Sequence, residues 1–140
     1  MKQIPVIFWT GTGNTQMMAD VIAAAINAAG AEAVVKNVSE ITADEAAGYA
    51  ALALGCPAMG AEVLEECEFE PFFTELEGKL NGKKVALFGS YGWGGSYMQD
   101  WEARVKDAGA ELVADGVLAL GAPDDEAEAK LAEAGKLLAE

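Results

Sequence analysis

Short apolar segments alternate with segments of helical periodicity along the chain, and this alternation constrains the fold more than any other feature. The alternation predicts one parallel sheet covered by helices on both faces, because each helix carries the chain back across the sheet. Strands are expected at residues 4–9, 33–38, 50–54, 84–89 and 111–120. The first helix is expected to be capped by Asn14 or Thr15 and to stop at Gly30, and further helices are expected at residues 43–47, 71–80, 97–108 and 124–139.

The length and composition fit a single domain spanning residues 1–140. The 140 residues are 52% apolar, include only 4 prolines, and contain no linker, repeat or low-complexity block. A chain of this size buries about 68–70% of its unfolded surface, so its core needs no disulfide or metal.

The charge and the absence of histidine exclude several classes of function. Acidic residues outnumber basic ones by 23 to 9, giving a formal net charge of −14, so nucleic-acid binding is not expected. The sequence contains no histidine, which excludes Ser-His-Asp and Cys-His catalysis, imidazole metal sites and a histidine pH switch.

The cysteines and apolar runs indicate a cytoplasmic protein that does not enter membranes. Cys56 and Cys67 form no CxxC motif, so we expect no metal site and interpret both as reduced thiols. The apolar run at residues 4–9 is too short for a signal peptide, and no segment approaches the roughly 20 apolar residues that span a bilayer.

Three loops of unusual composition follow expected strands, at residues 10–15, 55–62 and 90–97. Parallel strands share one direction, so these loops meet at the carboxyl edge of the sheet, where open α/β sheets bind ligands. Residues 10–15 combine glycines, hydroxyls and a helix N-terminus, a donor set that suits a phosphate. This loop lacks the Walker A lysine and the last small residue of the dinucleotide motif. Taken alone, it also fits an ordinary turn with a helix cap.

The other two loops add groups that suit a flat ring system. Met59 is a polarizable thioether beside a turn, Glu62 is a nearby acceptor, and Trp93 lies among glycines as an exposed stacking ring would. The alternatives are core packing for Met59 and a position folded back over the sheet edge for Trp93. Together the loops predict a site for a planar mononucleotide whose ring lies between Met59 and Trp93.

Several motifs then identify a family. They are WTGTGNT at residues 9–15, GCPAMG at 55–60, VLEE at 63–66, EPFF at 70–73 and GKKVALFGSYGWG at 82–94. With these motifs the chain resembles the flavodoxins over essentially its whole length. The uninterrupted fifth strand expected at 111–120 favours the short-chain kind found in anaerobic bacteria, since long-chain members carry an insertion there. The resemblance implies a flavodoxin-like, doubly wound, five-stranded parallel sheet of order 2-1-3-4-5, and a low-potential one-electron carrier with non-covalently bound FMN.

The resemblance also implies which residues bind FMN, with no catalytic residue among them. The first loop is expected to hold the phosphate, and the other two to hold the ring and its pyrimidine edge. The expected cofactor-binding residues are Thr10, Gly11, Thr12, Gly13, Asn14, Thr15, Pro57, Ala58, Met59, Gly60, Ala61, Glu62, Ser90, Tyr91, Gly92, Trp93 and Gly94.

Further roles are implied within the second loop. Glu62 would accept the N3 proton, and the Gly60–Ala61 peptide would turn over on one-electron reduction so that the Gly60 carbonyl accepts from N5. Relatives often carry Gly, Asn or Asp at position 61. An alanine Cβ costs about 1–2 kcal/mol in left-handed geometry, so Ala61→Gly should raise the first reduction potential. Pro57 stands where some relatives have a hydroxyl residue, which implies one hydrogen bond fewer.

An acidic run without Lys or Arg begins at the second loop, with glutamates at positions 62, 65, 66, 68, 70, 75 and 77. Glu75 and Glu77 are expected on a solvated helix face. Carboxylates nearest the ring would repel the anionic reduced flavin, so we expect a low second potential that rises with ionic strength. The same charge would steer basic-surfaced redox enzymes toward a monomeric carrier.

Two alternatives share the predicted topology. A receiver domain of two-component signalling needs a phosphorylatable Asp after the third strand, where this chain has Gly55–Cys56. An FMN-dependent quinone reductase is the closer alternative, although the chain is short and has no basic pocket for NADPH and no acid–base pair with histidine. An FMN protein that activates a metalloenzyme without carrying electrons also stays open.

Overall fold

The computed structural model describes residues 2–9, 13–57, 68–91, 96–120 and 123–140. The strands are β1 (Gln3–Phe8), β2 (Glu32–Asn37), β3 (Ala51–Gly55), β4 (Lys84–Tyr91), β5 (Glu111–Leu112) and β6 (Val117–Leu120). The helices are α1 (Asn14–Ala28), α2 (Ala43–Ala46), α3 (Phe69–Glu77), α4 (Ser96–Asp107) and α5 (Asp125–Ala139), with a 3₁₀ turn, η1, at Val38–Glu40.

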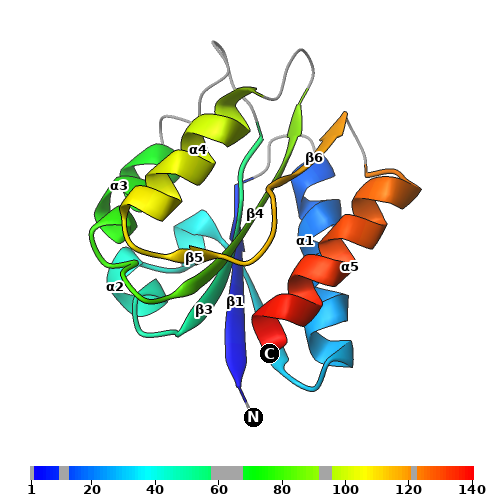
Figure 1. The fold of residues 1–140 in the computed structure, drawn as a ribbon, viewed down its shortest axis with the longest axis horizontal. Helices are drawn as coiled ribbons and strands as arrows, with labels where there is room; N and C mark the ends of the chain where they lie inside the picture. The colour runs from blue at the N-terminus through cyan, green and yellow to red at the C-terminus, as the bar shows by residue number, and fades with distance from the viewer. Residues whose placement is uncertain (1, 10–12, 58–67, 92–95, 121–122) are drawn as a thin grey trace.

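All strand pairs are parallel, in the order β2-β1-β3-β4-β5, with β6 also paired to β4. The order 2-1-3-4-5 is therefore confirmed. Helices α1 and α5 cover one face of the sheet, and α2, α3 and α4 cover the other (Figure 1).

Alternating side chains of the strands divide the core between these two faces. In β3, Ala51 and Ala53 pack toward α1 and α5, while Leu52 and Leu54 pack toward α3 and α4. This period of two is what a strand with both faces buried produces. The small alanines face two helices that approach each other closely. A Cβ added to Gly135 of α5 would lie 2.9 Å from the Cβ of Ala25 in α1.

The expected uninterrupted fifth strand is wrong. β5 and β6 both pair with β4, but residues 86–87 of β4 lie opposite residues 113–116, so the fifth strand carries two extra residues there. Helix α4 holds this break, because the Glu102 carboxylate accepts the Gly116 N–H at 2.6 Å. Asp115–Gly116 is also a turn-forming pair that the apolar pattern around it obscured.

Candidate functional site

The carboxyl ends of β1, β3 and β4 lie at one edge of the sheet, opposite the chain's N-terminus in Figure 1. Backbone hydrogen bonds continue past the strands at this edge. Trp9 N–H donates to the Gly55 carbonyl at 3.0 Å, and Cys56 N–H donates to the Phe88 carbonyl at 3.1 Å. The segments that leave these three strands therefore start from fixed, neighbouring positions, as the sequence predicted.

Helix α1 begins at this edge without a side-chain cap. Its N-cap is Gly13, with a φ of 92° that favours glycine, and its first turn contains no acidic residue. Two other helices begin differently: Thr42 caps α2 and Asp124 caps α5, and both have carboxylates in the first turn. The positive end of the α1 dipole is thus not neutralised by its own side chains, which suits an external anion. The predicted cap at Asn14 or Thr15 is wrong, because the chain enters the helix through glycine.

Thr15 and Ser90 meet below this helix terminus. Their hydroxyl oxygens lie 3.3 Å apart, and both residues are buried, with 1% and 5% of their surfaces exposed. Ser90 and Tyr91 were predicted to lie in a loop. They instead extend β4, where they pair with Ala119 and Leu120 of β6. The extra pairing fixes the Ser90 backbone, so its hydroxyl is held in place beside Thr15.

The second predicted loop leaves β3 through Cys56 and Pro57. Cys56 is fully buried, its thiol lies 3.5 Å from the Pro57 carbonyl, and Pro57 is half-buried. That Pro57 provides one hydrogen bond fewer than the hydroxyl residue of some relatives stays a prediction.

Most of the expected cofactor-binding residues lie outside the described part of the chain, and so does Cys67. They are Thr10, Gly11, Thr12, Ala58, Met59, Gly60, Ala61, Glu62, Gly92, Trp93 and Gly94. Of the expected cofactor-binding residues that the structure describes, Gly13, Asn14 and Thr15 lie at the beginning of α1, and Ser90 lies in β4 beside Thr15.

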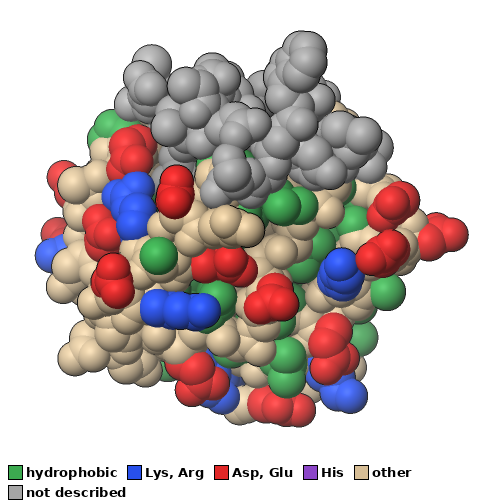
Figure 2. All heavy atoms as spheres, turned by 45° about the horizontal axis from the view of Figure 1, so that its top comes forward, with side chains coloured by type: hydrophobic (Ala, Val, Ile, Leu, Met, Phe, Trp, Pro, Cys, Tyr) green, Lys and Arg blue, Asp and Glu red, His purple; other side chains and the backbone are tan. Residues whose placement is uncertain are grey.

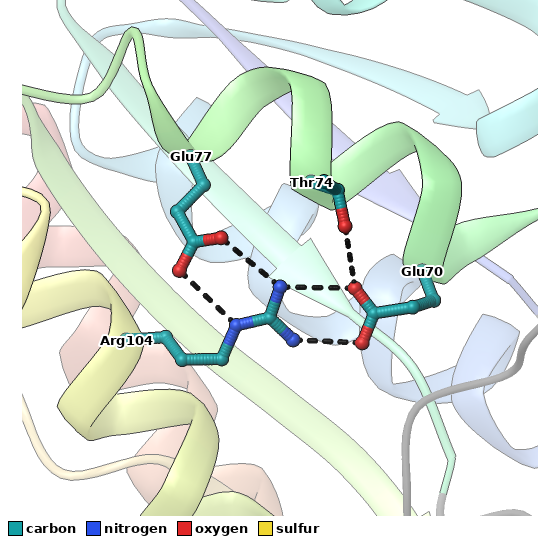
Figure 3. Close-up of polar contacts among 4 residues, drawn as sticks. All are labelled: Glu70, Thr74, Glu77 and Arg104. Carbon is teal, nitrogen blue, oxygen red and sulfur yellow. Dashed lines mark hydrogen bonds and ion pairs between the residues drawn. The ribbon is translucent and has the colours of Figure 1, made fainter.

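The acidic run is organised by a residue that the sequence analysis missed. The guanidinium of Arg104, in α4, contacts Glu70 at 2.7 Å and Glu77 at 3.1 Å, both on α3 (Figure 3). Glu77 was expected on a solvated face, but it is half-buried against Arg104, whereas Glu75 is exposed as expected. Helical spacing alone could have placed Glu70 and Glu77 on one face, since they are seven residues apart.

These contacts change the proton affinities of the paired groups. Hydrogen bonding to Arg104 lowers the pKa of Glu70, against the opposing effect of partial burial. Hydrogen bonds to Glu70 and then to Glu77 raise the pKa of Arg104. The Thr74 hydroxyl also donates to Glu70 at 2.8 Å, so this carboxylate is well supplied with donors. The Glu70 carboxylate and the Arg104 guanidinium therefore both remain charged at neutral pH.

A second contact joins the beginning of α3 to β1. Trp9 Nε1 donates to the Glu68 carboxylate at 3.2 Å.

Carboxylates are numerous on the face shown in Figure 2, where basic side chains are fewer. Among the described residues, no group of three or more His, Cys, Asp or Glu side chains is arranged to hold a metal. No helix in the described ranges is long and apolar enough to cross a bilayer.

Comparisons with known proteins agree with this geometry. The family model described as "Flavodoxin" matches residues 6–135. The chain is 48% identical to a flavodoxin of Clostridium beijerinckii over 96% of this chain and 97% of the relative. It is 47% identical to a flavodoxin of Megasphaera elsdenii over 82% and 85% of the two chains. The solution structure of two-electron reduced Megasphaera elsdenii flavodoxin superposes with a TM-score of 0.89, at 44% identity, over 97% of this chain and 98% of that one.

Proposed function

The chain belongs to the flavodoxin family, and we propose that its FMN lies at the carboxyl edge of the sheet with the phosphate at the N-terminus of α1. Flavodoxins bind FMN and carry electrons to redox partners, so this protein is an FMN-binding electron carrier rather than an enzyme. Bound FMN supplies the one-electron chemistry, and the protein supplies its binding and electrostatic surroundings.

The main support for the proposed phosphate position is the pair of hydroxyls of Thr15 and Ser90. They are buried together below a helix terminus that has no acidic residue in its first turn and no side-chain cap. None of residues 10–15 and 90–97 is Lys or Arg, so backbone dipoles and hydroxyls would hold the phosphate without a cation. This donor set fits a phosphomonoester.

The remaining predicted residues complete the proposed site. We propose that Met59 and Trp93 flank the ring, that Glu62 accepts from N3, and that Gly92 and Gly94 contact the pyrimidine edge. Their positions after β3 and β4 support this assignment, because both strands end at the edge where Thr15 and Ser90 meet.

Titration of the apoprotein with FMN and with riboflavin tests the phosphate position. Riboflavin lacks the phosphate, so wild type should bind FMN far more tightly. Thr15→Val and Ser90→Ala should each weaken FMN binding about tenfold, as expected for a lost hydrogen bond to a charged group, and leave riboflavin binding nearly unchanged. Ser39→Ala, at an exposed hydroxyl in η1, is the matched control. Equal losses for both flavins would contradict the assignment.

We also propose a cytoplasmic, monomeric carrier of low potential that meets basic-surfaced redox enzymes. The formal charge of −14 and the exposed carboxylates support electrostatic steering, and the two cysteines, which form no CxxC motif, suit a reducing compartment. Association rates with a basic redox partner should fall as salt rises, as stopped-flow measurements can show. Salt-independent rates would contradict the proposed steering.

The quinone-reductase alternative is not favoured, because the close relatives are flavodoxins. NADPH oxidation with a quinone acceptor should therefore show no turnover above that of free FMN.

A further inference from the structure

Tyr97 joins two strands and a helix at the carboxyl edge of the sheet. Its hydroxyl, in the first turn of α4, donates to the Cys56 carbonyl at 2.8 Å, immediately after β3. Tyr97 is only 3% exposed and Cys56 is fully buried, so water does not compete for this bond.

Gly89 of β4 makes room for this contact. A Cβ at position 89 would lie 2.1 Å from the Tyr97 hydroxyl oxygen and 2.2 Å from the Cys56 carbonyl oxygen. Only glycine fits there without displacing a buried group. Gly89, the Tyr97 phenol and the Cys56 carbonyl therefore form one packed unit.

The position of this unit along the chain suggests its role. Cys56 immediately precedes the segment that contains the proposed ring-binding residues 57–62. Tyr97 immediately follows the segment that contains residues 90–94, and Gly89 immediately precedes it. One hydrogen bond thus ties the start of one proposed flavin-binding segment to the end of the other.

We infer that Tyr97 is a positioning residue for FMN, which acts by holding the Cys56 carbonyl and so fixes the spacing between the two segments that flank the ring. This inference rests on the proposed function. Without the hydrogen bond from Tyr97 to Cys56, a smaller fraction of the apoprotein has the arrangement that binds FMN. The apparent affinity for FMN then decreases in proportion to that fraction. Burial, followed by the nearby Cys56, raises the pKa of the Tyr97 phenol, so the hydroxyl remains a donor at neutral pH.

Tyr97→Phe tests the inference because it removes only the hydroxyl. FMN affinity should fall about three- to tenfold relative to wild type. The residual fluorescence of the bound flavin should rise, because a less well-held ring is less completely quenched. In the apoprotein, the amides of Cys56 and Ser90 should exchange hydrogen faster. Tyr49→Phe is the matched control, since half-buried Tyr49 lies before β3, at the opposite edge of the sheet.

The outcomes separate this inference from the proposed function. If wild type binds FMN and Tyr97→Phe matches it in affinity, fluorescence and exchange, the inference is overturned and the proposed function stands. If Tyr97→Phe only lowers the unfolding midpoint, the residue is merely structural and the inference is again overturned. Wild-type protein that binds no FMN overturns both. Gly89→Ala displaces the same hydroxyl from the other side and should reproduce the Tyr97→Phe fluorescence change.

Discussion

Arg104 of α4 lies between Glu70 and Glu77, two carboxylates that are two turns apart on α3, and contacts them at 2.7 and 3.1 Å. Its guanidinium also lies 4.7 Å from the ring centroid of Phe73, so the cation is held on a third side by an aromatic face. Helix α3 follows the second proposed flavin-binding segment, and α4 follows the third. The arginine thus fixes the two helices that continue from the proposed site.

Replacement of Arg104 should therefore destabilise the fold. Arg104→Met keeps much of the apolar stem but leaves two half-buried carboxylates facing each other. We expect a loss of about 1–2 kcal/mol in the free energy of unfolding, between the values for exposed and buried pairs. Urea denaturation measures this loss. Lys130→Met, which breaks the exposed Lys130–Glu126 pair, is the control and should cost less than about 0.5 kcal/mol.

The same cluster predicts a pH dependence of stability. The pKa of Glu70 is lower in the folded state than in the unfolded chain. Its contribution is therefore complete above the unfolded pKa of about 4.3, and is lost as pH falls through the lower folded value. The stability difference between wild type and Arg104→Met should accordingly shrink as the pH is lowered from 6 to 3. A difference that stays constant over this range would show that Glu70 is not the group involved.

Replacing either of two glycines packed against α4 with alanine should lower the free energy of unfolding by different amounts. At Gly89 a Cβ meets the Cys56 carbonyl, part of the backbone, at 2.2 Å, whereas at Gly116 it meets the flexible Met98 side chain at 2.4 Å. Met98 can change rotamer and the Cys56 backbone cannot move without disturbing the sheet. We expect Gly89→Ala to cost about 3 kcal/mol and Gly116→Ala about 1 kcal/mol, at the upper and lower ends of overpacking costs. Equal losses in thermal unfolding would contradict this distinction.

The sequence predicts those parts of the fold that depend on local periodicity. Strands β1 to β4 and the helices agree with their expected positions to within a few residues, because alternation and helical spacing are properties of neighbouring residues. The convergence of loops at one sheet edge follows from strand direction alone. In contrast, the break in the fifth strand depends on Glu102 of α4, and the extra length of β4 depends on pairing with β6.

The long-range contacts of the site region escaped prediction for the same reason. Arg104 is 27 residues from Glu77, and Tyr97 is 41 residues from Cys56. No short motif links such partners, so Glu77 was assigned to solvent and Tyr97 received no role. The Thr15–Ser90 contact spans 75 residues, yet both residues were predicted to bind the cofactor, because each belongs to a motif that carries the family resemblance.

Trp101 offers a final test of the core beneath α4. Its ring packs edge-on against Phe69 and Phe73, with centroid distances of 5.4 and 5.9 Å, and the residue is 1% exposed. Its indole N–H is buried and, within the described part of the chain, has no hydrogen-bond partner. An unsatisfied donor of this kind costs about 1–3 kcal/mol, which offsets part of the packing that the larger ring provides.

Trp101→Phe should therefore change the free energy of unfolding by no more than about 1 kcal/mol, because the lost volume is balanced by removal of the unsatisfied N–H. Trp101→Ala should cost about 3–5 kcal/mol, because it leaves a cavity between Phe69 and Phe73. Urea denaturation of both variants separates the two effects. If Trp101→Phe costs nearly as much as Trp101→Ala, the indole N–H is satisfied in solution and the proposed balance is wrong.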